Sequence, residues 1–145
     1  MTPQRVTLIT LGVENLTRSK KFYEAIGWTA HSRSQDSIVF FQMNGLVLGI
    51  FGLEALADDQ GRPGARLGTG AMSLAINYET EEAVDQAFSN AINAGAKKLK
   101  QLQKVFWGGY SGYYADPDDH VWEIAMNPFW PLQSDGRLTL PDEDI

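Results

Sequence analysis

Hydrophobic positions in the first half of the chain follow the period of a strand and then that of a helix. Residues 5–13 (RVTLITLGV) are rich in β-branched side chains, which is typical of a strand. Asn15 is suited to cap a helix that runs to Ile26, and Gly27 is suited to end it. Three further strands are predicted at residues 28–32, 38–43 and 46–51, with a tight turn at Asn44-Gly45. The first half is therefore predicted as β-α-β-β-β.

The same order of elements follows a stretch that has no periodicity. Residues 53–70 are rich in Gly, Pro, Asp and Arg, and we predict a linker there. A predicted strand at 71–77 leads to a helix that Thr80 caps and Gly95 ends. Strands are then predicted at residues 99–105, 110–115 and 121–126.

This repetition predicts an α+β fold built from two tandem βαβββ modules, with antiparallel-rich sheets and outer helices. Module 1 covers about residues 5–52 and module 2 about residues 71–128, within a single domain at 1–128. Residues 129–145 form a C-terminal arm that is too apolar for a free tail. We expect the arm to latch onto its own domain or onto a partner subunit.

Alternation along the strands assigns two unlike faces to each sheet. In the last strand, Trp122, Ile124 and Met126 form a bulky apolar face suited to packing under a helix. The opposite face carries Glu123 and Ala125, and smaller or more polar residues also occupy one face of the strands at 5–13 and 71–77. We therefore expect the second face to line a cavity.

Composition narrows the class of protein. The 145 residues include 12 Lys and Arg, 18 Asp and Glu and no Cys, for a net charge of −6. The missing cysteines exclude disulfides and thiolate chemistry, and the acidic balance argues against a nucleic-acid partner. Apolar runs are too short for a membrane span, and the N-terminus does not resemble a signal peptide. A cytoplasmic protein with no membrane partner is expected.

Two motifs resemble the vicinal oxygen chelate superfamily, which contains glyoxalase, bleomycin resistance proteins and extradiol dioxygenases. Residues 11–16 (LGVENL) are similar to the opening of its first module, and residues 116–123 (DPDDHVWE) to the last hairpin of its second. Asp116–Asp119 is predicted as a turn, with Asp119 left-handed where the family usually has Gly. The resemblance implies sheets that curl into a ligand-binding cup, and a homodimer.

The resemblance also implies four metal-ligand positions. They fall at about Leu8, Leu48, Ser73 and Glu123, of which Glu123 alone is a competent ligand. A divalent ion needs several oxygen or nitrogen donors. We therefore expect a degenerate metal site and no cofactor. Binding of a divalent metal is the less favoured alternative.

A group of polar and aromatic residues is predicted to bind a small-molecule ligand. Glu123 is interpreted either as a general base or as an acceptor for a ligand's donor, and a purely structural partner for it is equally open. The aromatic residues near the glycine-rich run at 107–114 are interpreted as a ligand wall, with sheet packing as the alternative. The candidate ligand-binding residues are Thr10, Ser73, Asn77, Trp107, Tyr110, Tyr114 and Glu123.

Three functions are consistent with these residues. The leading hypothesis is a glyoxalase- or bleomycin-resistance-like protein that binds a small aromatic or apolar ligand without metal. The second is a lyase, isomerase or dioxygenase-type enzyme that uses Glu123 as a base or residual metal ligand. The third is a structural or regulatory dimer whose cup is filled by side chains.

Overall fold

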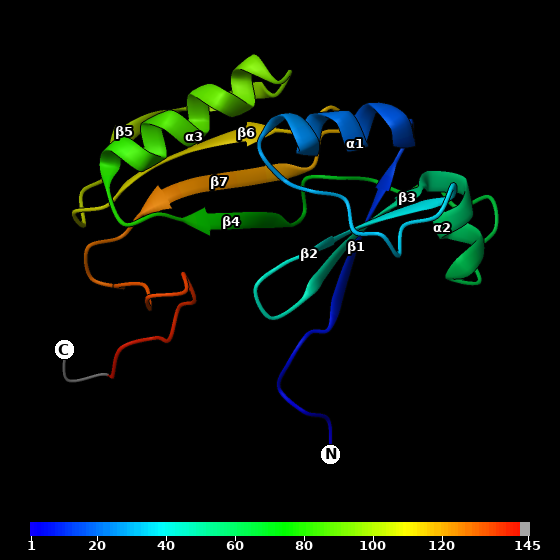
Figure 1. Cartoon of the computed structure of the whole chain (residues 1–145), viewed down its shortest axis with the longest axis horizontal. Coiled ribbons are helices and arrows are strands. Elements are labelled where there is room, and N and C mark those ends of the chain that lie inside the picture. Colours follow the sequence, from blue (N-terminus) through cyan, green and yellow to red (C-terminus); the bar gives the residue numbers. More distant parts are fainter. Residues whose placement is uncertain (143–145) are drawn as a thin grey trace. The chain divides into compact units, whose positions relative to one another are not determined.

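The computed structural model describes residues 1–142, and the last three residues of the predicted arm lie outside the described part. The chain divides between Thr69 and Gly70 into two compact units, unit 1 before this point and unit 2 after it (Figure 1). Each unit contains a mixed sheet in which antiparallel pairing is combined with one parallel pair. The predicted α+β class is confirmed.

Unit 1 contains a three-stranded sheet with the order β1-β3-β2. Its elements are β1 (Leu8–Val13), α1 (Leu16–Ala25), β2 (Ile38–Gln42), β3 (Val47–Gly52) and α2 (Leu53–Asp59). β1 is parallel to β3, and β2 is antiparallel to it. Leu11, Val13 and Ile50 are buried on the face that α1 covers, as the alternation predicted.

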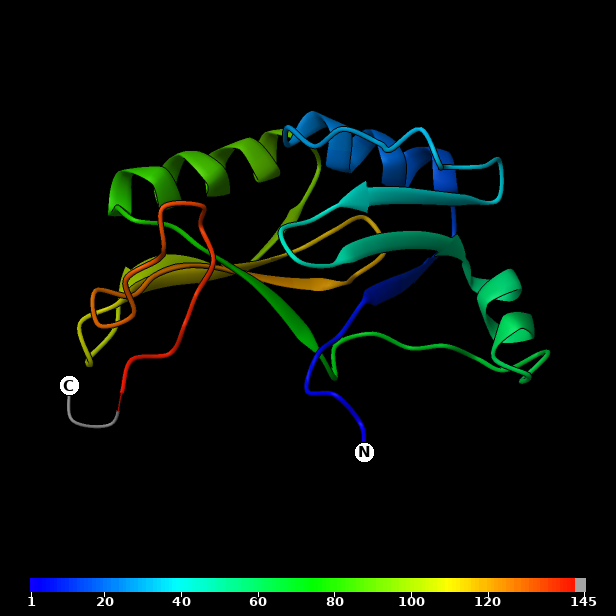
Figure 2. The same cartoon turned by 60° about the horizontal axis from the view of Figure 1, so that its bottom comes forward.

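Unit 2 contains a four-stranded sheet with the order β4-β7-β6-β5. Its elements are β4 (Ser73–Asn77), α3 (Glu81–Asn93), β5 (Lys97–Lys104), β6 (Tyr110–Ala115) and β7 (Val121–Met126). α3 lies across one face of this sheet and packs on β6 and β7 (Figure 2). Trp122 and Ile124 are buried under it, so the predicted helix-facing side of β7 is confirmed.

The helix ends have the predicted caps. The Asn15 side chain accepts a hydrogen bond from the Arg18 amide at 3.0 Å, and the Thr80 hydroxyl accepts one from the Ala83 amide at 3.1 Å. Both satisfy an amide that has no partner within the helix. Gly27 and Gly95 each follow a helix with φ at +112°, a conformation that glycine adopts without steric cost.

The turn before β7 also has the predicted conformation. The Asp116 carboxylate accepts hydrogen bonds from the Asp118 and His120 amides, both at 2.9 Å. Asp119 has φ at +68°, in the left-handed region that Asp tolerates better than most residues. His120 therefore belongs to a turn held by its neighbours.

Two sequence predictions in unit 1 were wrong. Residues 28–32 do not form a strand, because Trp28 stacks on Tyr23 at 5.0 Å and the His31 amide makes a lone backbone hydrogen bond to Phe40. The predicted linker at 53–70 begins with α2, which buries Ala57. A short helix with no side-chain cap gives little signal in a sequence.

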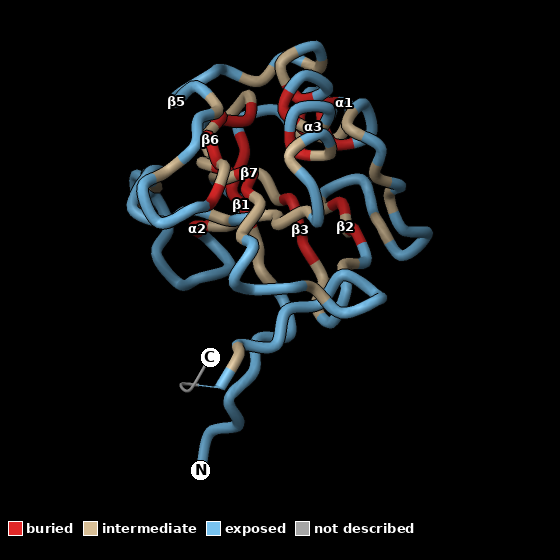
Figure 3. The backbone as a smooth tube through the Cα atoms, turned by 90° about the vertical axis from the view of Figure 1, so that its left-hand side faces the viewer, coloured by how far each residue is buried: buried red, intermediate tan, exposed pale blue. Residues whose placement is uncertain are grey.

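Burial follows the sheets and the helix sides that face them (Figure 3). None of the helices among residues 1–142 has the length and apolar character needed to cross a membrane.

Candidate ligand pocket

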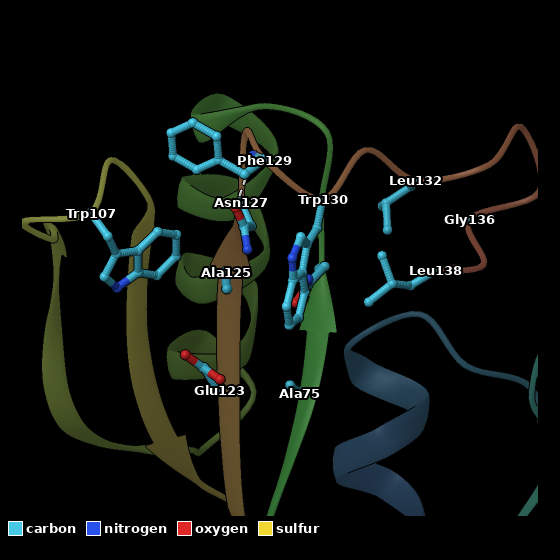
Figure 4. Close-up of a pocket in the computed structure, with 11 residues that line it drawn as sticks. Ala75, Trp107, Glu123, Ala125, Asn127, Phe129, Trp130, Leu132, Gly136 and Leu138 are labelled. Carbon is cyan, nitrogen blue, oxygen red and sulfur yellow. Dashed lines mark hydrogen bonds between the residues drawn. The ribbon is translucent and has the colours of Figure 1, made fainter. Parts of the chain in front are cut away.

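Unit 2 contains a pocket of about 690 Å³ on the sheet face opposite α3. The residues that line it come from β4, β7, the β5–β6 turn and the C-terminal arm (Figure 4). They are Ala75, Asn77, Trp107, Glu123, Ala125, Asn127, Phe129, Trp130, Leu132, Gly136 and Leu138.

The floor of the pocket is the parallel pair of β4 and β7. Ala75 lies beside Glu123, and Asn77 lies beside Ala125, with all four on one face. The two alanines leave the space that larger residues would fill. Alternation had assigned this face to a cavity, and the pocket confirms that assignment for unit 2.

One wall of the pocket is the indole of Trp107, which the β5–β6 turn holds in place. The Gly108 amide donates to the Val105 carbonyl at 2.9 Å, and the Val105 amide donates to the Gly109 carbonyl at 2.9 Å. A Cβ atom at Gly109 would lie 2.1 Å from the Trp107 ring, so the ring can occupy its place only beside a glycine. Gly108, with φ at +102°, brings the Phe129 ring alongside the turn.

The other wall is the C-terminal arm, which follows β7 and lies over its own unit. The Asn127 side chain accepts a hydrogen bond from the Phe129 amide at 2.9 Å, and its carbonyl accepts one from the Trp130 amide at 3.2 Å. Farther along, Gln133 and Arg137 form a backbone turn. These bonds place Trp130 on the side of β7 away from Trp107 (Figure 4).

Glu123 projects from β7 into the pocket. Among the lining residues that the structure describes, it is the only ionisable one. Tyr113 lies opposite it in the antiparallel pair of β6 and β7. Burial raises the pKa of the Tyr113 phenol, as do the charge of Glu123 and the hydrogen bond to it. The phenol therefore stays protonated at neutral pH and acts as a donor to the carboxylate.

The structure separates the predicted ligand-binding residues into two groups. Asn77, Trp107 and Glu123 line the pocket. Ser73 shares their face but lies beyond the pocket, and Thr10 lies on β1 in unit 1, beside Gly49.

Two of the predicted residues are structural. Tyr114 is 2% exposed and packs edge-on against Phe88 of α3, with ring centroids 6.2 Å apart. The Tyr110 hydroxyl donates to the Asp85 carboxylate of α3 at 2.5 Å. Both side chains lie on the helix side of β6, because they share the parity of Gly112, which pairs with the buried Ile124.

Sequence reasoning missed the phenol beside Glu123 and most of the arm's contribution. Tyr113 has the opposite parity to Tyr110 and Tyr114, and pairing the strands would have placed it with Glu123. The apolar residues of the arm signalled an attached segment. The remaining missed residues are Ala75, Ala125, Asn127, Phe129, Trp130, Leu132, Gly136 and Leu138.

The expected metal positions do not supply a ligand set. Leu48 is 2% exposed and pairs with Ile9, so it lies on the helix side of its sheet and cannot share a ligand site with Leu8 on the other face. Val47 is the neighbour of Leu8 and has no donor atom. Within each unit, the described residues contain no group of three or more His, Asp or Glu side chains that could hold a metal ion. The donor set does not fit a divalent cation.

Comparisons with known proteins identify the family. The model of the Glyoxalase/Bleomycin resistance protein/Dioxygenase superfamily matches residues 5–124, and the chain belongs to this superfamily. The resemblance seen in the sequence is thereby confirmed. A glyoxalase-related enzyme from Fulvimarina pelagi is 39% identical, with 97% of this chain and 100% of that chain covered and a TM-score of 0.89.

More distant structures share the fold alone. A glyoxalase/bleomycin resistance protein/dioxygenase family enzyme from Burkholderia phytofirmans PsJN is 21% identical, with 83% and 96% coverage and a TM-score of 0.73. A lactoylglutathione lyase from Agrobacterium tumefaciens is 18% identical, with 91% and 100% coverage and a TM-score of 0.67. The comparison with curated proteins found no match.

Proposed function

We propose that this chain binds a small organic molecule with an aromatic or apolar body in the pocket of unit 2, and that binding needs no metal ion. The observation that carries the proposal is the lining of the pocket, in which two indoles, a phenyl ring and two leucines surround one carboxylate. Pockets of roughly 300–1,000 Å³ with apolar walls and a few polar groups are typical small-molecule sites.

Exposure of the aromatic walls supports a ligand. Trp107 and Trp130 are each 41% exposed, and Phe129 is 61% exposed. Leaving such large apolar surfaces in water is unfavourable, and a ligand that covers them is stabilised by their burial. Asn77 and Asn127 add amide groups that can orient the ligand.

A fragment screen tests this function. We would screen a library of mono- and bicyclic aromatic compounds by thermal shift and retest the hits on Trp107→Ala. The matched control is Phe106→Ala, because Phe106 is the fully exposed neighbour of Trp107 and does not line the pocket. The affinity of the hits should fall at least about tenfold for Trp107→Ala and stay unchanged for the control. Equal affinity for both variants would place the binding elsewhere.

Metal independence has its own test. Protein purified without chelators, soaked in divalent ions and desalted should retain far less than one ion per chain, because Glu123 is the sole competent donor at the family positions. Near-stoichiometric retention that Glu123→Ala abolishes would contradict this part of the proposal.

A second candidate is an enzyme of lyase, isomerase or dioxygenase type in which Glu123 acts as a base. It is favoured by the carboxylate in the pocket and by the similarity to the glyoxalase-related enzyme from Fulvimarina pelagi. If a screen hit is turned over, Glu123→Gln should abolish turnover while retaining the shape of the side chain. Unchanged kinetics would exclude Glu123 as the base.

A further inference from the structure

We propose that the pocket of unit 2 selects organic cations, namely a protonated amine or quaternary ammonium group attached to an aromatic or apolar body, with Glu123 as the counter-ion. This inference rests on the proposed function and specifies the charge of its ligand. It excludes carboxylates and phosphates as ligands of the same site.

The distribution of charge around Glu123 carries the first step. Within residues 70–142, no Lys, Arg or His forms an ion pair with its carboxylate. Two lysines of β5 are engaged elsewhere, since Lys97 pairs with Asp119 and Lys104 pairs with Glu81 at 3.2 Å. A carboxylate that lacks a counter-ion in a partly enclosed site favours a cation there.

Lys100 is the lysine whose backbone lies nearest in the sheet. It pairs with Tyr113, which in turn pairs with Glu123, so two strand spacings separate Lys100 from the carboxylate. Lys100 is exposed and does not line the pocket. Arg137 lies between the lining residues Gly136 and Leu138, but it pairs with Asp135 and does not line the pocket either. An anionic ligand would therefore meet Glu123 with no basic lining residue to offset the repulsion.

The hydrogen bonds of Glu123 leave room for a ligand. An ionised carboxylate has about four acceptor sites, and the Tyr113 phenol occupies one of them. The remaining acceptor sites can receive the N–H groups of an ammonium ion.

The aromatic walls carry the second, independent step. Trp107 and Trp130 lie on opposite sides of β7, the strand from which Glu123 projects (Figure 4). The face of an indole ring carries negative electrostatic potential and attracts a cation more strongly than the face of any other side chain. Both walls and the floor therefore favour the same charge on the ligand.

Three probes that share an indole ring separate charge from shape. Tryptamine is cationic, tryptophol is neutral and indole-3-acetate is anionic at pH 7. We would measure the Kd of each by ¹H–¹⁵N correlation spectra of the full chain at fixed ionic strength. Tryptamine should bind about tenfold more tightly than tryptophol, and indole-3-acetate should bind most weakly.

Variants assign the preference to one residue. Glu123→Gln should bring the Kd values of tryptamine and tryptophol within about threefold of each other. The control, Glu24→Gln, changes the net charge of the chain equally at an exposed site on α1 and should keep the preference. Loss of the preference in both variants would assign it to the overall charge of −6 and overturn the proposal.

The outcomes distinguish this inference from the proposed function. Equal or tighter binding of tryptophol or indole-3-acetate by the native chain overturns the cation preference, whatever the variants show, and leaves the binding function standing. Failure of tryptamine to bind, while neutral or anionic library members do bind in the pocket, has the same meaning. Failure of every probe and every library member overturns both.

Discussion

Tyr113 lies directly opposite Glu123 across the antiparallel pair of β6 and β7, while the next residue, Tyr114, lies opposite the buried Trp122. The side chains of these neighbouring tyrosines therefore lie on opposite faces of one sheet. The first faces the ligand pocket and donates to its carboxylate, and the second completes the core under α3. This single alternation decides which tyrosine of the strand lies beside Glu123.

The two tyrosines should respond differently to truncation. Tyr114→Ala should lower the free energy of unfolding by about 3–5 kcal/mol, because it removes a buried aromatic side chain and leaves a cavity. Tyr113→Ala should cost roughly 1 kcal/mol or less, since Tyr113 is only half-buried. Urea denaturation followed by circular dichroism measures both. Similar losses for the two variants would contradict the assignment of faces.

Gly109→Ala should weaken ligand binding by displacing the Trp107 ring, which would lie 2.1 Å from the added Cβ atom. Gly68→Ala is the matched control, because no atom lies within 4 Å of its added Cβ and its φ is not in the left-handed region. We expect hits from the fragment screen to lose about tenfold in affinity with Gly109→Ala. If both variants bind equally well, the position of Trp107 does not matter for binding.

Truncation after Pro128 should abolish most ligand binding, because it removes Phe129, Trp130 and the leucines of the arm from the pocket. It should also lower the melting temperature of the protein by a few degrees, about 1–2 kcal/mol in stability, since apolar contacts with the sheet are lost. A chain that ends at Asp142 retains every lining residue and serves as the control. If truncation after Pro128 changes neither the ligand affinity nor the melting temperature, the arm is not a wall of the pocket.

Tyr110→Phe should change alkaline stability without changing ligand binding. The hydrogen bond to Asp85, followed by burial and the charges of Asp85 and Glu81, raises the pKa of Tyr110 from 10.0 to about 12. A pKa raised in the folded state means that this group's stabilisation is complete below about pH 10 and disappears as the pH rises to about 12.

At pH 7 the Tyr110→Phe variant should therefore be less stable than the native chain by about 1 kcal/mol. The difference should shrink between pH 10 and 12, as followed by chemical denaturation at each pH. A difference that stays constant through this range would argue against the bond to Asp85.

The elements that the sequence predicted well are those with strong local signals. Asn15 and Thr80 are helix caps with their own hydrogen bonds, and the alternation in β7 assigned Trp122 and Glu123 to their correct sides. These features depend on residues that are near one another in the chain. Local propensity and side-chain periodicity are therefore sufficient to predict them.

The features that were missed depend on pairing between distant segments. The sides of Tyr110 and Tyr114 follow from the register of β6 against β7, which composition alone does not reveal. Leu48 was placed on the wrong side for the same reason, because its register against Ile9 decides its orientation. Trp28 looks like a strand residue but stacks on Tyr23 of α1 instead.

The four tryptophans provide the most direct test of ligand binding in this pocket. Trp107 and Trp130 line it, whereas Trp122 is buried under α3 and Trp28 stacks within unit 1. Each indole N–H gives one signal in a ¹H–¹⁵N correlation spectrum. On titration with a hit from the fragment screen, the signals of Trp107 and Trp130 should shift together with one Kd, while those of Trp28 and Trp122 stay in place. Shifts confined to Trp28 or Trp122, or no shift for any hit, would contradict the account.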